Sequence, residues 1–191
     1  MANSGWSCVL GLVEQAAAFT ATECAEIVEL ARSAGFSPGR LVGGIGNGDI
    51  RTASISWLDE DRGAAWVLQR LASSAASMNR SHFGLDLSEF RERMQVASYE
   101  GSQNGHFGWH SDIGGGKLAN FRKLTIVVQL SPGEAYSGGE LEVNANGQPC
   151  AASREQGVLI AFPSFVLHRV KPVETGIRHS LTVWMHGPLF R

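Results

Sequence analysis

The sequence predicts an antiparallel β-barrel built from two sheets and braced by helices near the N-terminus. Hydrophobic residues follow a helical period in the first third of the chain, and from about residue 93 they follow a period of two. Turn-forming residues separate the alternating segments at short intervals, and 23 glycines against 6 prolines favour many tight turns. We therefore expect a mainly β protein with helical support.

The first predicted helix begins after Thr20. Thr20 and Glu23 have the spacing of a capping box, in which each side chain binds the backbone N–H of the other residue. One apolar face follows, at Cys24, Ile27, Val28 and Ala31. Gly35 then stands where a helix C-cap is expected.

A strand and a second helix are predicted next. Residues 51–58 alternate as a strand does, and a helix is expected to start near Asp59. Its buried stripe consists of Ala64, Val67, Leu68, Leu71, Ala75 and Met78. The glycine-rich stretch Gly39–Gly48 lacks the Lys-Ser/Thr ending of a phosphate-binding loop, so we expect it to form a mobile loop near a substrate entrance.

The rest of the chain predicts the barrel. Candidate strands are residues 93–99, 124–130, 140–143, 157–161, 167–170 and 180–185. Turn sequences such as Ser131-Pro132-Gly133 and Asn146-Gly147 fall between them. No internal repeat or long linker is visible, so residues 1–191 are expected to form one domain, with helical support over about 1–85 and the barrel over about 93–187.

Composition excludes several classes of protein. The chain is 43% hydrophobic and 18% charged with a formal net charge of −2, so it predicts a globular fold and gives no electrostatic reason to expect nucleic acid as a partner. Three scattered cysteines predict a reducing compartment rather than a disulfide framework. We find no apolar run of membrane-spanning length and no basic secretory signal, so we expect a cytoplasmic protein without a membrane partner.

Three side chains form a candidate metal site. His110 and Asp112 are two residues apart, and in extended backbone such residues point the same way. With His168 from a distant strand they match the two-His, one-carboxylate triad of non-haem Fe(II) oxygenases, which leaves positions open for other ligands. An H-x-D triplet alone is weak evidence, since a hydrogen-bonded core or loop histidine explains it equally well.

Arg178 adds a candidate anion-binding group. It follows His168 by one predicted turn, so we expect a hairpin that returns Arg178 alongside the His168 strand. A guanidinium there can bind a carboxylate through two parallel hydrogen bonds. The alternative is a surface salt bridge.

Several spaced motifs follow one another along the second half of the chain: Tyr99-Glu100-Gly101, Gly105 to Asp112, Arg122-Lys123-Leu124-Thr125, Gly138-Gly139-Glu140-Leu141, Phe162, Leu167 to Val170, Pro172-Val173, Gly176, Arg178 and Thr182-Val183-Trp184. Together they resemble the prolyl 4-hydroxylase-like branch of the 2-oxoglutarate, Fe(II)-dependent dioxygenases. Upstream, Arg51, Ser54, Trp57 and Leu58 are similar to the strand before the family's second helix. Their order along the chain is more specific than any one of them.

The resemblance implies a double-stranded β-helix, or jelly roll, with iron at its mouth. It implies Fe(II) ligation by His110, Asp112 and His168, and binding of the 2-oxoglutarate C5 carboxylate by Arg178. Tyr99 and Thr125 match positions that line the cosubstrate pocket. Gln129 replaces a tyrosine that some members use on that carboxylate, and it could donate through its amide or be a partly exposed strand residue.

The implied reaction is hydroxylation of an unactivated C–H bond with O2 as oxidant, with release of succinate and CO2 and with ascorbate as a possible reductant. The substrate would be a prolyl or other peptidyl residue, or an amino-acid-derived small molecule. Two alternatives are an oxidative demethylase of the same class and a non-catalytic cupin-like metal-binding barrel, which has no need of Arg178 or Tyr99. The sequence does not indicate the oligomeric state.

Overall fold

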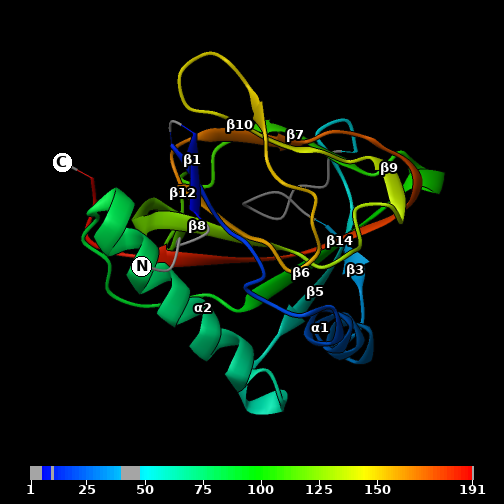
Figure 1. Ribbon diagram of the computed structural model, residues 1–191, viewed down its shortest axis with the longest axis horizontal. Coiled ribbons are helices and arrows are strands. Elements are labelled where there is room, and N and C mark those ends of the chain that lie inside the picture. Colours follow the sequence, from blue (N-terminus) through cyan, green and yellow to red (C-terminus); the bar gives the residue numbers. More distant parts are fainter. Residues whose placement is uncertain (1–5, 10, 40–47, 191) are drawn as a thin grey trace.

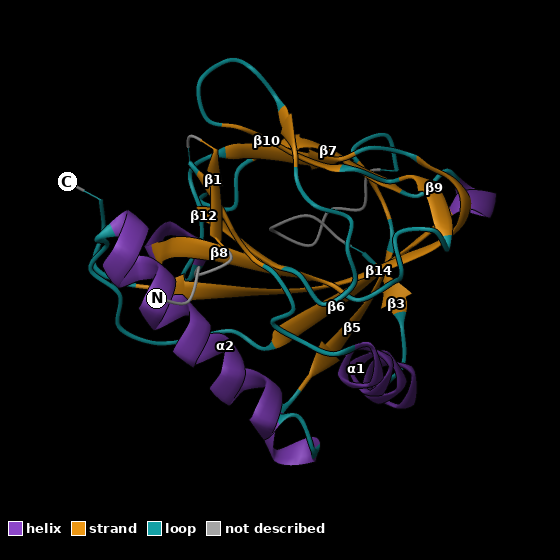
Figure 2. Cartoon of the chain, in the orientation of Figure 1, coloured by secondary structure: helices purple, strands orange, loops and turns teal. Residues whose placement is uncertain are grey.

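The structure is a computed structural model that describes residues 6–9, 11–39 and 48–190. Two antiparallel sheets lie face to face, and two long helices cover the outer face of the larger sheet (Figures 1 and 2). These helices are α1, Ala21–Ala34, and α2, Ala65–Met78. Shorter helical turns span Glu60–Arg62, Asn79–Phe83, Gly101–Gln103 and Ala119–Phe121.

Neighbouring strands in both sheets are antiparallel. The larger sheet contains, in spatial order, β1 (Trp6–Val9), β2 (Leu12–Gln15), β12 (Leu159–Pro163), β8 (Arg122–Gln129), β14 (Val173–His186), β6 (Met94–Glu100), β5 (Ser54–Leu58) and β3 (Ser37–Pro38). A further short strand, β9 (Tyr136–Gly138), pairs with β14 outside this order. The smaller sheet contains β11 (Cys150–Ala151), β10 (Leu141–Asn144), β13 (Leu167–Val170), β7 (His106–His110) and β4 (Arg51–Thr52).

Strand β8 shows how the alternating pattern separates two cores. All eight of its residues are buried. Leu124, Ile126 and Val128 pack with the apolar stripes of α1 and α2 in a core on the helix side of the larger sheet. Val127 faces the other way, into a second core between the two sheets. Because successive side chains point to opposite faces, polar residues placed between the helix-side residues reach the barrel interior.

Local signals placed the first helix correctly. Thr20 accepts from the backbone N–H of Glu23, Glu23 accepts from the backbone N–H of Thr20, and Gly35 is the C-cap. The second helix begins later than expected. The chain forms a short 3-10 turn after Asp59 and passes through Gly63, whose φ is +88°, before α2 starts at Ala65.

The segment over residues 51–58 was expected to be one strand and is two. Arg51 and Thr52 pair with β7 in the smaller sheet, whereas Ser54–Leu58 pairs with β6 in the larger one. The region expected to give helical support, about 1–85, likewise contains strands β1–β5. The stretch Gly39–Gly48 lies largely outside the described residues. No helix in the described part of the chain has the length and hydropathy of a membrane span.

Gly157 is a position where the fold requires glycine. Its φ is +80°, and a Cβ there would lie 1.9 Å from the carbonyl oxygen of Phe19. We expect Gly157→Ala to lower the free energy of unfolding by about 3 kcal/mol or more. Gly147→Ala is the matched control, because Gly147 has a φ of +89° but no atom within 4 Å of its Cβ position. Urea denaturation should show a loss of only about 1–2 kcal/mol there, and equal losses in both variants would contradict the steric argument.

Candidate active site

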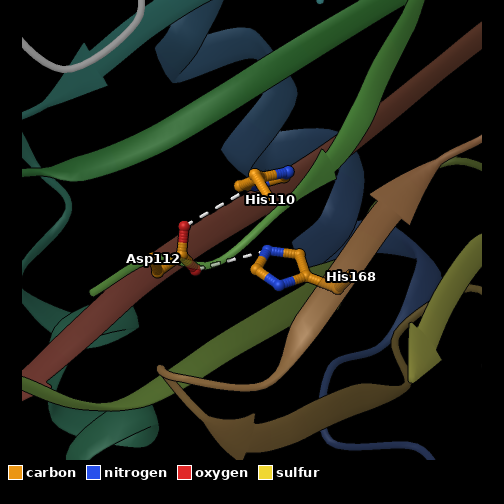
Figure 3. Close-up of side chains that lie close together, drawn as sticks. All are labelled: His110, Asp112 and His168. Carbon is orange, nitrogen blue, oxygen red and sulfur yellow. Dashed lines mark ion pairs between the residues drawn. The ribbon is translucent and has the colours of Figure 1, made fainter. Parts of the chain in front are cut away.

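The three predicted metal ligands meet between the two sheets. His110 ends β7 and stands directly opposite His168 of β13 in the antiparallel register, and Asp112 follows two residues after His110. Their ligand atoms all lie within 4.8 Å of one another. Nε2 of His110 lies 3.7 Å from Oδ1 of Asp112, and Nε2 of His168 lies 3.4 Å from Oδ2 (Figure 3). One divalent cation fits this spacing.

Hydrogen bonds orient both imidazole rings in the same way. Nδ1 of His110 lies 2.8 Å from the carbonyl oxygen of Gly108, and Nδ1 of His168 lies 3.0 Å from that of Val166. A carbonyl oxygen can only accept, so each Nδ1 carries the proton and each Nε2 keeps its lone pair. This arrangement is typical of histidines that bind a metal.

Asp112 is fixed on both its backbone and its side chain. Its N–H donates to the carbonyl oxygen of Ser164 at 2.9 Å, and its own carbonyl oxygen accepts from Arg122 at 3.1 Å. Thr125 donates its hydroxyl to Oδ2 at 2.8 Å. Thr125 was expected to line the cosubstrate pocket, and in the structure it orients the carboxylate of Asp112.

The protonation states also favour metal binding. Burial, followed by the charge of His168, lowers the pKa of His110 to about 4, although Asp112 opposes this. Burial alone would raise the pKa of Asp112, but His168, His110 and the hydrogen bond from Thr125 lower it below its ordinary value. A neutral imidazole and an ionised carboxylate are the forms that coordinate a cation.

Arg178 lies inside the barrel with no acidic partner among the described residues. Its side chain is 1% exposed, and no hydrogen bond is formed by its Nε atom. Together with the triad it lines one small inner cavity, so the guanidinium and the metal ligands face a common space. A buried cation without a counter-charge is unfavourable unless an anion binds beside it.

The hairpin expected to carry Arg178 is not formed. Residues 173–186 are one long strand of the larger sheet, whereas His168 lies in the smaller sheet. Arg178 instead pairs in register with Tyr99 of β6 and faces His168 across the barrel. The two residues meet because the sheets are packed face to face, not because their strands are neighbours.

Gln129 and Tyr99 lie beside Arg178. The Gln129 side chain is buried, its Oε1 accepts from Nη2 of Arg178 at 2.9 Å, and its Nε2 donates to the carbonyl oxygen of Ser153 at 3.0 Å. Gln129 was expected to offer its amide to the cosubstrate or to be partly exposed, and it is instead positioned behind the guanidinium. The guanidinium carbon lies 5.4 Å from the centroid of the Tyr99 ring, which lines the inner cavity.

An outer cavity of about 670 Å³ adjoins the triad. It is lined mainly by apolar side chains, among them Trp109, which is 38% exposed, and also by polar residues and by Gly115 and Gly116. Sequence reasoning missed a buried network on its wall, in which Glu92 binds Arg122 through both oxygens and also pairs with Nε2 of His186 at 3.0 Å. Glu92 lies just before a predicted strand, but nothing in its sequence context singled it out.

The Glu92 network gives a pH prediction. Burial would raise the pKa of Glu92, but Arg122 and His186 lower it to about 2. The contribution of this carboxylate to stability is therefore present above pH 4.5 and is lost as the pH falls towards 2. We expect Glu92→Gln to lower the free energy of unfolding by up to about 3 kcal/mol at pH 7 and to have little effect near pH 2. Urea denaturation at both pH values measures this, and a difference that is independent of pH would contradict it.

Comparison with known proteins identifies the part of the chain that carries this site. Residues 94–186 match the sequence profile of the 2OG-Fe(II) oxygenase superfamily. Residues 94–186 belong to this superfamily. The predicted resemblance is thereby confirmed, and the matched segment contains all three triad residues and Arg178.

Individual relatives agree with this assignment. The chain is 32% identical over 84 residues to a PKHD-type hydroxylase of Crocosphaera subtropica, and 35% identical over 94 residues to one of a Janthinobacterium species. These alignments cover 43% and 47% of this chain and only 38% and 41% of the relatives. The chain therefore spans less than half the length of these relatives.

Solved structures confirm the predicted fold class. A Trichoplax adhaerens prolyl hydroxylase, solved with a peptide fragment of hypoxia inducible factor, superposes with a TM-score of 0.78 at 20% identity, covering 93% of this chain and 84% of the other. A Pseudomonas putida prolyl-4-hydroxylase superposes with a TM-score of 0.72 at 23% identity, covering 93% of each chain. The two-sheet barrel is thus the double-stranded β-helix of the 2OG-Fe(II) oxygenases.

Proposed function

We propose that this protein is a 2-oxoglutarate- and Fe(II)-dependent dioxygenase. In this proposal it hydroxylates an unactivated C–H bond of a prolyl or other peptidyl residue, or of an amino-acid-derived small molecule, and releases succinate and CO2. The observation that carries the proposal is the position of Arg178, buried and without an acidic partner among the described residues, in the same cavity as the His110, Asp112 and His168 triad.

The donor set fits ferrous iron. Two imidazole nitrogens and one carboxylate oxygen, without thiolate, form a triad that binds one side of the metal and leaves the other positions for cosubstrate and O2. In the proposal, His110, Asp112 and His168 hold Fe(II). When bound, Fe(II) and 2-oxoglutarate would supply the oxidising chemistry, with O2 as the oxidant.

The remaining residues bind and orient. The guanidinium of Arg178 would bind the C5 carboxylate, and Gln129 would hold that guanidinium in place. Thr125 and Arg122 fix the side chain and the backbone of Asp112, so the ligand geometry is set before iron arrives. Burial of these groups keeps water away and strengthens their interactions with the bound anion.

Arg178 also favours the dioxygenase proposal over the alternative of a metal-binding barrel without catalytic turnover. Such a barrel needs the triad but has no use for a buried guanidinium that lacks a counter-ion. In a dioxygenase, a dicarboxylate cosubstrate supplies that counter-ion each time it binds.

Succinate release tests the proposal directly. The purified protein, given Fe(II), 2-oxoglutarate and ascorbate in air, should form succinate in an oxygen-dependent reaction. The same protein loaded with Zn(II), which has no redox chemistry, should form none. If the Fe(II)-loaded protein binds 2-oxoglutarate but forms no succinate over the background, the proposed activity is wrong.

A further inference from the structure

A second arginine at the site has no assigned role. Arg51 lies on β4, at the edge of the smaller sheet, and pairs in register with Phe107 of the neighbouring strand. It lines both the inner cavity of the triad and the outer cavity of about 670 Å³. Arg51 therefore stands where the two cavities meet.

Arg51 forms no ion pair with an acidic side chain in the described part of the chain. Its Nη2 donates to Oε1 of Gln95 at 2.9 Å, which is a neutral partner. Its Nε is buried and makes no hydrogen bond. The residues outside the described ranges include no Asp or Glu, so they add no acidic side chain as a partner. Two carboxylates line the outer cavity with Arg51: Glu92 is bound by Arg122 and His186, and Asp112 belongs to the proposed metal triad.

Aromatic stacking fixes the guanidinium relative to the metal site. The guanidinium carbon of Arg51 lies 4.5 Å from the centroid of the Phe107 ring. The same ring stacks on His110, with 3.6 Å between centroids and 17° between planes. The Phe107 ring thus contacts both the guanidinium of Arg51 and the proposed metal ligand His110. In a molecule bound by Arg51, the carbon that reacts would lie near the metal. Only a few bonds would join that carbon to the group that binds the guanidinium.

We propose that Arg51 binds a carboxylate of the primary substrate. The substrate is therefore a free carboxylic acid of amino-acid size rather than an internal residue of a peptide. This inference rests on the proposed function and selects among its substrate classes. An internal peptide residue with a neutral side chain, such as a prolyl residue, offers only neutral carbonyl groups to the guanidinium, which would leave the charge of Arg51 unbalanced. A carboxylate balances it and can accept two parallel hydrogen bonds from the guanidinium.

The outer cavity suits such a ligand. Its volume lies within the range of pockets that bind small molecules. Exposed apolar side chains at its lining, Ile50, Trp109 and Leu118, offer contacts for the hydrocarbon part of the substrate. Arg51 is thus the one guanidinium among the described residues of this cavity that is available to bind an anion, since Arg122 is bound by Glu92.

Nuclear magnetic resonance can test the binding without turnover. The protein is labelled with ¹⁵N-arginine, loaded with Zn(II) and saturated with 2-oxoglutarate, so that Arg178 is already occupied. The Nε resonance of Arg51 is assigned by its loss in Arg51→Lys. We expect at least one free proteinogenic L-amino acid to shift this resonance saturably, while its α-carboxamide does not. If no free acid shifts it, or if acid and amide shift it equally, the inference is wrong, whether or not the protein releases succinate.

Kinetics give an independent test. The probes are the free L-amino acids, their α-carboxamides and N- and C-terminally blocked tripeptides, each scored by the succinate released above the rate without primary substrate. We expect a free acid to stimulate succinate release at least 10-fold more than its amide does. We also expect Arg51→Gln to raise the KM for that acid by roughly 30-fold or more, as loss of a buried ion pair does. Arg80→Gln removes an exposed arginine from the surface and should match the wild type. Equal stimulation by acids, amides and blocked peptides, or an unchanged KM in Arg51→Gln, would overturn the proposal.

Discussion

Replacement of His168 by alanine is expected to lower succinate formation by more than about 100-fold, and His110→Ala should do the same. Each change removes one of three ligands, and loss even of a group that only orients a metal ligand typically costs 10–100-fold. Metal binding should fall in parallel, which isothermal titration with Mn(II) measures without turnover. Thr125→Val should give a smaller loss of about 10–100-fold, because it removes only the hydrogen bond to Asp112.

His82→Ala is the matched control for the histidine variants. His82 is exposed and lies in the helical turn after α2, away from both cavities. This variant should bind Mn(II) and form succinate as the wild type does. Circular dichroism must show that all variants are folded. Retained Mn(II) affinity in a folded His168→Ala would show that the metal is held elsewhere.

Replacement of Arg178 by methionine is expected to weaken 2-oxoglutarate binding by about 2–5 kcal/mol, which is roughly 30- to 5,000-fold in Kd. The guanidinium is buried, so no water replaces it as a partner for the carboxylate. The protein without cosubstrate should become no less stable, because the uncompensated charge is removed and replaced by an apolar side chain of similar length. Titration of the Mn(II)-loaded protein with 2-oxoglutarate measures the first effect, and thermal unfolding measures the second.

Gln129→Leu separates binding of the anion from positioning of the guanidinium. It keeps the charge of Arg178 but removes the oxygen that holds Nη2. Its effect on the Kd of 2-oxoglutarate should be clearly smaller than that of Arg178→Met. An unchanged Kd in Arg178→Met would place the carboxylate against another group and would remove the main support for the proposed cosubstrate.

Features that depend on neighbouring residues could be predicted from the sequence. The capping box of Thr20 and Glu23 and the C-cap at Gly35 need only a few consecutive residues. The strand over residues 167–170 has the predicted bounds, and the strands near 93–99 and 124–130 differ by a few residues at their ends. The alternating pattern records which residues are buried, and burial is what stabilises these strands.

Features that depend on the pairing of distant segments could not be predicted from the sequence. Alternation continues unchanged across Ala53, so it does not reveal that the chain passes from one sheet to the other there. The turn between His168 and Arg178 suggested a hairpin, because turn residues do not report whether the next strand pairs with the previous one or crosses to the facing sheet.

The candidate site shows the same division. The spacing of His110 and Asp112 could be read in one segment. His168 was proposed as the third ligand of that triad and Arg178 through a predicted hairpin, and the order of several motifs supported both. The hydrogen-bond partners of the site residues could not be predicted, because Gln129 contacts Arg178, and Glu92 contacts Arg122, only after the strands have paired. Arg51 became a candidate only when the structure showed that its charge has no acidic partner in the described part of the chain.

The two bonds from imidazole Nδ1 to the carbonyl oxygens of Gly108 and Val166 have an evolutionary consequence. Every residue type has a carbonyl oxygen, so point substitutions at these two positions leave the acceptors in place. The protonation pattern that leaves each Nε2 free to bind a metal therefore depends on the path of the backbone and not on the side chains at these two positions.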